Sequence, residues 1–439
     1  MKLFAVAGNP ILHSRSPRIY AKLFRETGLD AAYFRLSARN SNELVGMVRE
    51  MGLEGINVTL PFKLDLIPYL DELEAPAREA GAVNCVVKRG NRLVGANTDH
   101  IGVDKTIRAH GIDPAGRKAV VFGAGGAARA AVYALVKAGA SRVTIINRTL
   151  EKARAIMPGP SVEVLSFEES GPVLKESDIC LSCIPGPGSL TDFRSLKDGC
   201  LYMSASYKDA IQGGPGDGRG PVLIDGREWL IYQLAPSYEI MTGEAPPASF
   251  PDDEAWKLAA APPERKPNIA IIGFSGTGKT TAGQILASRM GYGFVDTDAL
   301  VESRMGMSVP EIFRRFGEEA FRNAEKEALA LAIPGSKRTV FTVGGGAPSG
   351  RENADVIRRH CLGVWLWAPA GISMGRIEEG SRPLLNHKDA AMEAERLLAA
   401  RIPDYARISD LALSSESGPA ETTAKRIEYE IDQAFGNQR

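Results

Sequence analysis

The feature that most constrains the fold is the segment Gly273–Thr281, GFSGTGKTT, which directly follows the apolar run Asn268–Ile272. It matches G-x-x-x-x-G-K-[ST], a pattern in which backbone N–H groups of a glycine-rich loop surround phosphate oxygens between a strand and a helix. This arrangement requires an α/β fold and predicts an ATP site with Mg²⁺ on the Thr280 hydroxyl. The predicted nucleotide contacts in this loop are Gly276, Gly278, Lys279, Thr280 and Thr281.

Short apolar runs typical of buried strands alternate with helical stretches along the chain, which indicates parallel sheets with crossover helices. These runs are Leu3–Ala7, Ala119–Phe122, Val143–Ile146, Ile269–Ile272, Val340–Val343 and Val364–Trp367. The prolines and charges of Ala261–Pro267, APPERKP, predict a linker. We expect the preceding helix, about Asp252–Ala261, to close the first part of the chain.

Composition narrows the class of protein. A chain of 439 residues suggests two to four domains. Lys+Arg and Asp+Glu are both 53, so neither nucleic acid nor an anionic membrane is expected as a partner. The five cysteines form no disulfide framework, and we find no long apolar span or targeting segment. These features predict a cytoplasmic protein.

A second glycine-rich segment, Gly123–Arg129 (GAGGAAR), follows the strand-like run Ala119–Phe122. With the helix and strand that come next, it forms one βαβ unit of the dinucleotide-binding type. The second strand ends in Asn147-Arg148-Thr149, without the acid that would bond a ribose 2′-OH. A guanidinium there suits a 2′-phosphate, so we expect NADP(H) in place of NAD. The predicted contacts are Gly123, Gly125, Gly126, Ala127, Asn147, Arg148 and Thr149.

Several polar groups after the first loop bear on its reaction. Asp296 and Asp298 follow a short strand and would point toward the phosphates, one for the hydrated metal and one for a substrate hydroxyl. The bare glycines of Val343–Ala347, VGGGA, would let a substrate ring approach the backbone. The basic segment Arg376–Leu385 has the composition of a lid over phosphates.

The C-terminal part, Asn268–Phe435, resembles shikimate kinase through GFSGTGKTT, DTD, FG-E-x-x-FR-x-x-E, GGGA, RPLL and RIPDYAR. The resemblance implies that shikimate is held by Asp298, Arg322, Gly345 and Arg401. It also implies that Asp298 orients the attacking hydroxyl and acts as base. Asp296 and Thr280 would serve Mg²⁺, while Lys279 and Arg382 would stabilise the transferring phosphoryl group.

The N-terminal part, Met1–Ala261, resembles shikimate dehydrogenase through HS-x-SP, NVT-x-PFK, GAVN, NTD-x-x-G, GAGGAAR and NRT, in that order. The resemblance implies a catalytic pair, Lys63 and Asp99. An ammonium can stabilise the alkoxide that forms when hydride reaches a ketone, and can donate the proton. Asp99 would hold Lys63 and favour its charged form. The implied substrate contacts are Ser14, Ser16, Thr59, Asn84, Tyr207 and Gln233.

The sequence also departs from the dehydrogenase pattern, with Tyr20-Ala21 for His-Asn, Cys85 for Thr, and changes at Ser182 and Ser204. We expect these changes to gather around the nicotinamide pocket and its closing loop. Two alternatives therefore stay open beside an active dehydrogenase. The first part of the chain could prefer quinate, or it could be a decayed sensor of shikimate or NADPH beside an active kinase.

The predicted architecture is α/β throughout: a substrate domain and a Rossmann NADP domain, then a P-loop domain of the nucleoside monophosphate kinase type. Its segments are 1–101 with a return at 228–261 for the substrate, 102–227 for NADP, the linker 262–267, and the kinase 268–439. The implied function belongs to the shikimate pathway of aromatic amino acid biosynthesis. It is the reduction of 3-dehydroshikimate to shikimate with NADPH, then phosphorylation of shikimate to shikimate 3-phosphate with MgATP.

Overall fold

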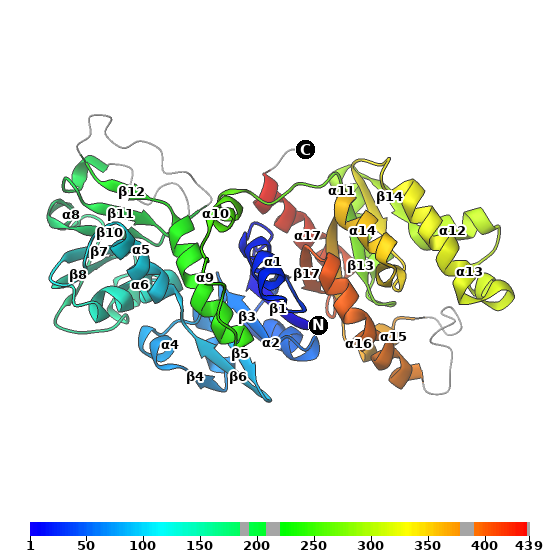
Figure 1. The fold of residues 1–439 in the computed structure, drawn as a ribbon, viewed down its shortest axis with the longest axis horizontal. Helices are drawn as coiled ribbons and strands as arrows, with labels where there is room; N and C mark the ends of the chain where they lie inside the picture. Colours follow the sequence, from blue (N-terminus) through cyan, green and yellow to red (C-terminus); the bar gives the residue numbers. More distant parts are fainter. Residues whose placement is uncertain (185–192, 208–219, 378–389, 437–439) are drawn as a thin grey trace. The chain divides into compact units, whose positions relative to one another are not determined.

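The computed structural model describes residues 1–184, 193–207, 220–377 and 390–436 (Figure 1). By packing, the chain divides into two compact units. Unit 1 combines Met1–Pro17, Asp30–Leu53 and Pro262–Arg439, and unit 2 combines Arg18–Leu29 with Glu54–Ala261. The four predicted segments divide the chain differently and stay a prediction about which stretch carries which activity.

The strands of unit 1 lie in the order β14-β15-β13-β16-β17-β2-β1, and every neighbouring pair in this row is parallel. Their inner members are rich in Val, Ile and Leu because both faces are covered. The bounds are β1 (Lys2–Gly8), β2 (Ala31–Ser37), β13 (Asn268–Gly273), β14 (Gly293–Asp296), β15 (Thr339–Thr342), β16 (Cys361–Trp367) and β17 (Leu411–Ser414). Thus β2, from the first forty residues, pairs directly with β17 near the C-terminus.

The helices of unit 1 follow its strands as crossovers. One of them, α13, is broken at Gly317, which has φ 82°. They are α2 (Ser41–Glu50), α11 (Lys279–Met290), α12 (Thr297–Met305), α13 (Val309–Ala332), α14 (Arg351–His360), α15 (Ala370–Met374), α16 (Ala390–Ile408) and α17 (Ala420–Phe435), with the 3₁₀ turn η3 (Ala347–Ser349). Helices α11 and α17 pack against each other.

Unit 2 contains a parallel sheet in the order β12-β11-β10-β7-β8-β9. Its strands are β7 (Lys118–Phe122), β8 (Arg142–Ile146), β9 (Val162–Leu165), β10 (Ile179–Ser182), β11 (Leu201–Ser204) and β12 (Val222–Ile224). Strands β8 and β9 are added on one side of β7, and β10, β11 and β12 are added on the other. The loop after β7 therefore lies at the point where the strand order reverses. Open α/β sheets bind ligands at this point.

A smaller mixed group of strands, β3-β5-β6-β4, completes the sheets of unit 2. These strands are β3 (Gly55–Val58), β4 (Glu72–Leu73), β5 (Cys85–Arg89) and β6 (Arg92–Ala96). The helices are α1 (Ser16–Thr27), α3 (Phe62–Asp65), α4 (Ala75–Ala80), α5 (Asp99–Ala109), α6 (Gly126–Lys137), α7 (Leu150–Arg154), α8 (Gly171–Glu176), α9 (Gly226–Thr242) and α10 (Asp253–Ala260), with η1 (Ile67–Tyr69) and η2 (Phe193–Ser195). Helix α9 packs against α5 and β5.

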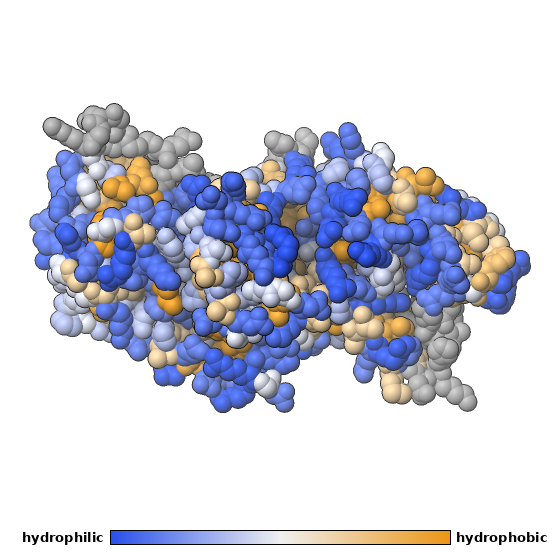
Figure 2. Space-filling view, in the orientation of Figure 1, coloured by the Kyte–Doolittle hydropathy of each residue, from blue (hydrophilic) through white to orange (hydrophobic). Residues whose placement is uncertain are grey.

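The structure confirms the α/β fold with parallel sheets, and each apolar run that we predicted as a strand overlaps an observed one. The predicted helix Asp252–Ala261 is α10. Among the described residues, no helix is long and apolar enough to cross a membrane. On the face drawn in Figure 2, hydrophobic residues form small patches separated by hydrophilic surface.

Candidate active sites

The loop between β13 and α11 has the geometry that its sequence predicts. Gly276 has φ 80°, and a Cβ there would lie 2.1 Å from the Ser373 carbonyl oxygen, so this position excludes larger residues. The Phe274 carbonyl oxygen accepts hydrogen bonds from the Thr277 hydroxyl at 2.9 Å and from Lys279 Nζ at 2.8 Å. The loop therefore leads into the N-terminus of α11, which favours phosphate.

A pocket of about 300 Å³ opens beside this loop. It is lined by Ser275, Gly276, Gly278, Lys279, Thr280, Thr281, Asp296, Asp298, Thr342, Val343, Gly344, Gly345 and Arg376. Most of these were predicted as site residues. Thr342 was not, although it ends β15 at the carboxyl edge of the sheet, where ligand-binding residues gather in open α/β sheets.

Asp296 lines one part of the pocket and binds the groups around it. Its Oδ2 accepts hydrogen bonds from the hydroxyls of Thr280, at 2.9 Å, and Thr342, at 3.1 Å. Its Oδ1 caps α12 by accepting from the Asp298 N–H at 3.0 Å. Among described residues, no group of three or more His, Cys, Asp and Glu side chains could form a metal cage. One carboxylate beside one hydroxyl instead fits Mg²⁺, which is bound by few protein ligands together with phosphate and water.

Two acids and two arginines converge on the glycine triplet after β15. A Cβ on Gly344 would lie 2.7 Å from both Asp298 Oδ1 and Glu325 Oε1. The corresponding atom would lie 3.4 Å from Arg401 Nη1 at Gly345 and 2.4 Å from Arg322 Nη2 at Gly346. The backbone of the triplet is thus surrounded by charged groups, which suits a small ligand with a carboxylate and hydroxyls.

Glu325 belongs to this group, although the sequence did not lead us to predict it as a site residue. Its Oε2 lies 2.9 Å from Arg322 Nη1, and its side chain is 1% exposed. Burial raises the pKa of the Glu325 carboxyl to about 7, against the lowering effect of Arg322 and with a raising contribution from Asp298. The signal was present in the sequence, because Glu325 lies one turn after Arg322. Arg382 lies outside the described residues.

In unit 2 the predicted catalytic pair is formed. Lys63 Nζ donates a hydrogen bond to Asp99 Oδ2 at 2.5 Å. The two side chains are only 13% and 8% exposed. Lys63 lies in the short helix α3, whereas Asp99 is the first residue of α5, so two separate turns place one cation against one anion. An ammonium held in this way can donate a proton, and the resulting amine can take up another.

A buried amide cluster borders this pair. Asn84 Nδ2 donates to the Thr98 hydroxyl at 3.0 Å and to Gln233 Oε1 at 3.1 Å. Thr98 donates its N–H to Asn84 Oδ1 at 2.7 Å and its hydroxyl to Gln233 at 3.1 Å. Since Thr98 directly precedes Asp99, the cluster adjoins the Lys63–Asp99 pair along the chain. Asn84 and Gln233 were predicted, and Thr98 was recognised only as part of the NTD motif.

The dinucleotide-type loop reaches the same pair. A Cβ on Gly126, the first residue of α6, would lie 2.5 Å from Lys63 Cβ and 2.8 Å from its Cδ. At the end of the neighbouring β8, Asn147 Nδ2 bonds the Thr149 carbonyl oxygen at 2.8 Å, and the Arg148 side chain is exposed. A glycine loop against Lys63 and a basic residue at the next strand end fit an NADP-type dinucleotide.

The other predicted substrate contacts lie in both units. Ser14 and Ser16 belong to unit 1, where they are buried. Thr59 and Tyr207 belong to unit 2 and are partly exposed, as is the predicted cofactor contact Ala127.

Two of the sequence departures, Tyr20 and Cys85, lie in the core of the protein, and the expected gathering of the departures around the nicotinamide pocket stays a prediction. Both are completely buried. Tyr20 Oη donates to Ser237 Oγ at 3.2 Å, and Asn57 Nδ2 lies 2.5 Å from the same oxygen. Helices α1 and α9 and strand β3 thus meet around the Ser237 hydroxyl, and Tyr20 helps to fill this part of the core.

Family models match three stretches of the chain. They are the shikimate dehydrogenase substrate binding domain over residues 6–86, shikimate / quinate 5-dehydrogenase over 108–200, and shikimate kinase over 275–432. The curated shikimate dehydrogenase (NADP(+)) of Symbiobacterium thermophilum is 34% identical over 266 residues, which cover 56% of this chain and 90% of that protein.

Solved structures agree with this similarity. Shikimate 5-dehydrogenase from Thermus thermophilus in complex with shikimate matches with a TM-score of 0.52 and 29% identity, covering 59% of this chain and 98% of that one. The same enzyme in complex with NADP(H) and shikimate matches with a TM-score of 0.51 and 27% identity over the same shares.

Proposed function

Because the chain belongs to the shikimate dehydrogenase family and carries a shikimate kinase domain after it, we propose that it catalyses two consecutive reactions. The first is reduction of 3-dehydroshikimate to shikimate with NADPH. The second is phosphorylation of the shikimate 3-hydroxyl with MgATP. The observation that carries the proposal is the presence of two separate charged constellations, Lys63–Asp99 in unit 2 and the Lys279 pocket in unit 1.

In the first reaction Lys63 acts as the proton donor. NADPH supplies the hydride when it is bound at the loop after β7. As the ketone gains hydride, the Lys63 ammonium stabilises the developing alkoxide and transfers a proton to it. Asp99, 2.5 Å away, keeps Nζ in place through the reaction. The contact of Gly126 with the Lys63 stem supports this assignment, because it keeps the cofactor loop beside the proposed proton donor, Lys63.

The amide cluster positions the substrate in that reaction. Asn84 and Gln233 are fixed by Thr98, so their remaining donors and acceptors are already oriented for ring hydroxyls. Ser14, Ser16, Thr59 and Tyr207 complete the proposed contacts to hydroxyls and carboxylate. Arg148 and its neighbours at the end of β8 hold the 2′-phosphate of the cofactor.

In the second reaction Asp298 orients the 3-hydroxyl and accepts its proton as that oxygen attacks phosphorus. Arg322 and Arg401, which both lie beside the triplet, hold the substrate carboxylate, and Gly345 lets the ring approach the backbone. Lys279 moves from the Phe274 carbonyl to the β- and γ-phosphates of ATP, where its charge offsets that of the transferring group. Thr280 and Asp296 would hold Mg²⁺, which offsets phosphate charge.

Replacing each of the two lysines by alanine tests whether the two reactions use separate sites. Lys63→Ala should lower ketone reduction about 1000-fold, the usual scale for a lost general acid, and leave phosphorylation unchanged. Lys279→Ala should do the reverse. Both activities are measured on each folded full-length variant. If either substitution silenced both reactions in a folded protein, two independent sites would be the wrong description.

Quinate is the alternative substrate for unit 2, because the family model over residues 108–200 covers shikimate and quinate enzymes together. Rates with shikimate and quinate, each with NADP⁺ and NAD⁺, decide between them. We propose the cytoplasm as the location, since the five cysteines are all free thiols.

A further inference from the structure

The last helix of the chain carries a buried acid that no step of either reaction uses. Glu430, in α17, is 1% exposed. Its Oε2 accepts hydrogen bonds from the backbone N–H groups of Ile11, at 2.7 Å, and Leu12, at 2.9 Å. These residues belong to the segment 8–17 that carries Ser14 and Ser16. A residue from the kinase end of the chain therefore contacts the proposed substrate loop of the dehydrogenase, within unit 1.

The carbonyl side of the same loop is also tied to the C-terminal part. The Ser14 carbonyl oxygen accepts from Arg35 Nε at 3.0 Å and Nη2 at 2.6 Å. Arg35 Nη1 donates to the Asp410 carbonyl oxygen at 3.2 Å. The loop turns between these two attachments, since the Ser14 N–H bonds the Ile11 carbonyl oxygen at 2.9 Å. Both the N–H and the C=O groups that set the turn are thus supported by charged side chains.

Apolar packing holds the loop against α17. Ile11 and Leu12 are 0% and 1% exposed, and they share one core cluster with Leu413, Ile427 and Ile431. The carboxylate of Glu430 therefore meets the two N–H groups of the loop within apolar packing. Loss of the acid would leave two adjacent N–H groups without a partner, which is costly enough to rearrange a loop.

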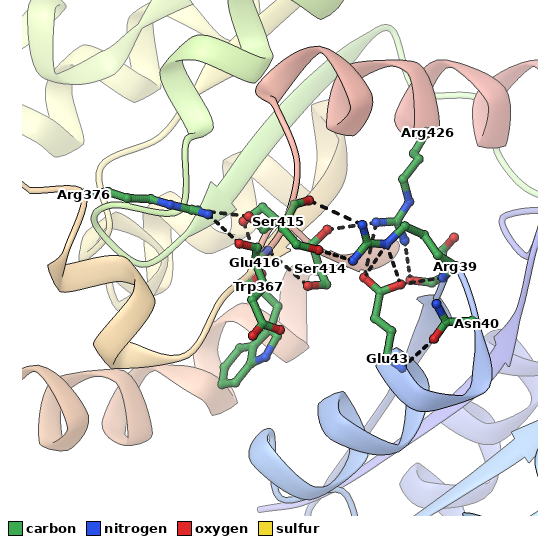
Figure 3. A network of polar contacts seen from close by, with 11 residues as sticks. Arg39, Asn40, Glu43, Trp367, Arg376, Ser414, Ser415, Glu416 and Arg426 are labelled. Atoms are coloured by element: carbon green, nitrogen blue, oxygen red, sulfur yellow. Dashed lines mark hydrogen bonds and ion pairs between the residues drawn. The ribbon is translucent and has the colours of Figure 1, made fainter.

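A second attachment fixes the direction of α17 (Figure 3). Arg426, one turn before Glu430, donates to the Ser414 carbonyl oxygen at 2.9 Å and to the Ser37 carbonyl oxygen at 3.2 Å. These oxygens end the paired strands β17 and β2. Arg426 also lies 3.5 Å from Glu43 of α2. The helix is therefore anchored to the ends of β17 and β2 by the partly buried Arg426, and it reaches the loop through the buried Glu430.

We propose that Glu430 is a positioning residue of the dehydrogenase, through which the helix that closes the kinase sets the placement of Ser14 and Ser16. The inference rests on the proposed reduction of 3-dehydroshikimate. It gives the fused helix a role in the first reaction besides its place in the second domain. A dehydrogenase separated from this helix would have to support the loop in another way.

Kinetics of three full-length variants test the role. Glu430→Ala should raise the KM for shikimate about tenfold in NADP⁺ reduction without ATP, while the KM for NADP⁺, kcat and the phosphorylation rate change little. Glu430→Gln keeps an acceptor oxygen and should recover most of the affinity. Glu428→Gln is the matched control, because this buried acid of the same helix pairs with Arg289 of α11. Its KM for shikimate in NADP⁺ reduction should equal that of the wild type.

An unchanged KM in Glu430→Ala, or an equal rise in Glu428→Gln, would overturn the inference. Hydrogen exchange of the wild-type chain gives a second test that needs neither turnover nor a variant. The amides of Ile11 and Leu12 should exchange as slowly as those in the middle of α17, and fast exchange would contradict the proposal. A wild type that phosphorylates shikimate but never reduces NADP⁺ would instead refute the proposed first reaction, whatever the exchange shows.

Discussion

The two glycine-rich loops of this chain differ in what requires their glycines. In the loop after β13, Gly276 is constrained by its own positive φ and by a backbone oxygen, that of Ser373. In the loop after β7, Gly126 starts a helix, and what excludes a side chain is the stem of Lys63. The first requirement is set by main chain and the second by the side chain of Lys63.

This difference explains why the two sequence patterns carry unequal information. Residues 273–281 match every fixed position of G-x-x-x-x-G-K-[ST], so the pattern predicts the loop on its own. The pattern at 123–129 has fewer fixed positions and is weak alone, and it does not indicate the contact of Gly126 with Lys63, 63 positions earlier. Only the fold brings this loop and Lys63 together.

The largest effect should come from Gly276→Ala. The added methyl would need a shift of about 1 Å in main chain and would keep an unfavourable φ, which together cost about 1000-fold in phosphorylation. Gly278→Ala also has positive φ but meets no atom within 4 Å, so its loss should be far smaller. Rates of ADP formation with saturating shikimate measure both. Similar losses would mean that backbone space is not what distinguishes this loop.

Gly126→Ala should act on the other reaction by displacing Lys63. Because the side chain can yield, we expect a loss of about 100-fold in 3-dehydroshikimate reduction, with phosphorylation unaffected. Gly125→Ala adds a methyl where no atom lies within 4 Å and should cost much less. Equal losses would show that the loop acts through the cofactor phosphates and not through the lysine.

Substitution of Arg148 should change only the binding of the cofactor. Arg148→Ala should raise the KM for NADPH about tenfold and leave that for NADH unchanged, because only NADPH carries the 2′-phosphate. Arg142→Ala, at the other end of β8, removes an equally exposed arginine and is the control. An equal rise in the KM for NADPH and the KM for NADH would argue against a 2′-phosphate contact.

The smallest effect should be a pH dependence that only the kinase shows. The pKa of Glu325, about 7, lies above the usual carboxyl value, so this group is neutral below pH 7 and charged above it. Ionised Glu325 competes for Arg322, and the KM for shikimate in phosphorylation should rise about threefold from pH 6 to pH 8. Glu325→Gln should abolish the step, whereas Glu318→Gln, which removes an exposed partner of Arg322, should keep it. Identical profiles in all three proteins would exclude Glu325 as the cause.

Much of this molecule follows from local sequence. The buried strands, the phosphate loop and the helix α10 before the linker were predicted, because each depends on neighbouring residues. The Lys63–Asp99 pair was predicted from family motifs and is observed at 2.5 Å. What sequence reasoning missed lies in long-range packing. The pairing of β2 with β17 joins residues more than 370 positions apart. The core position of Tyr20 depends on Ser237, which no local pattern indicates.

A coupled assay tests the central claim of two reactions in one chain most directly. The purified chain receives 3-dehydroshikimate, NADPH and MgATP, and NADPH loss and shikimate 3-phosphate are followed together. We predict that both proceed, with product equal to the NADPH consumed after a lag. A chain that phosphorylates added shikimate but leaves NADPH untouched in the presence of 3-dehydroshikimate would contradict the account and favour a sensor in unit 2.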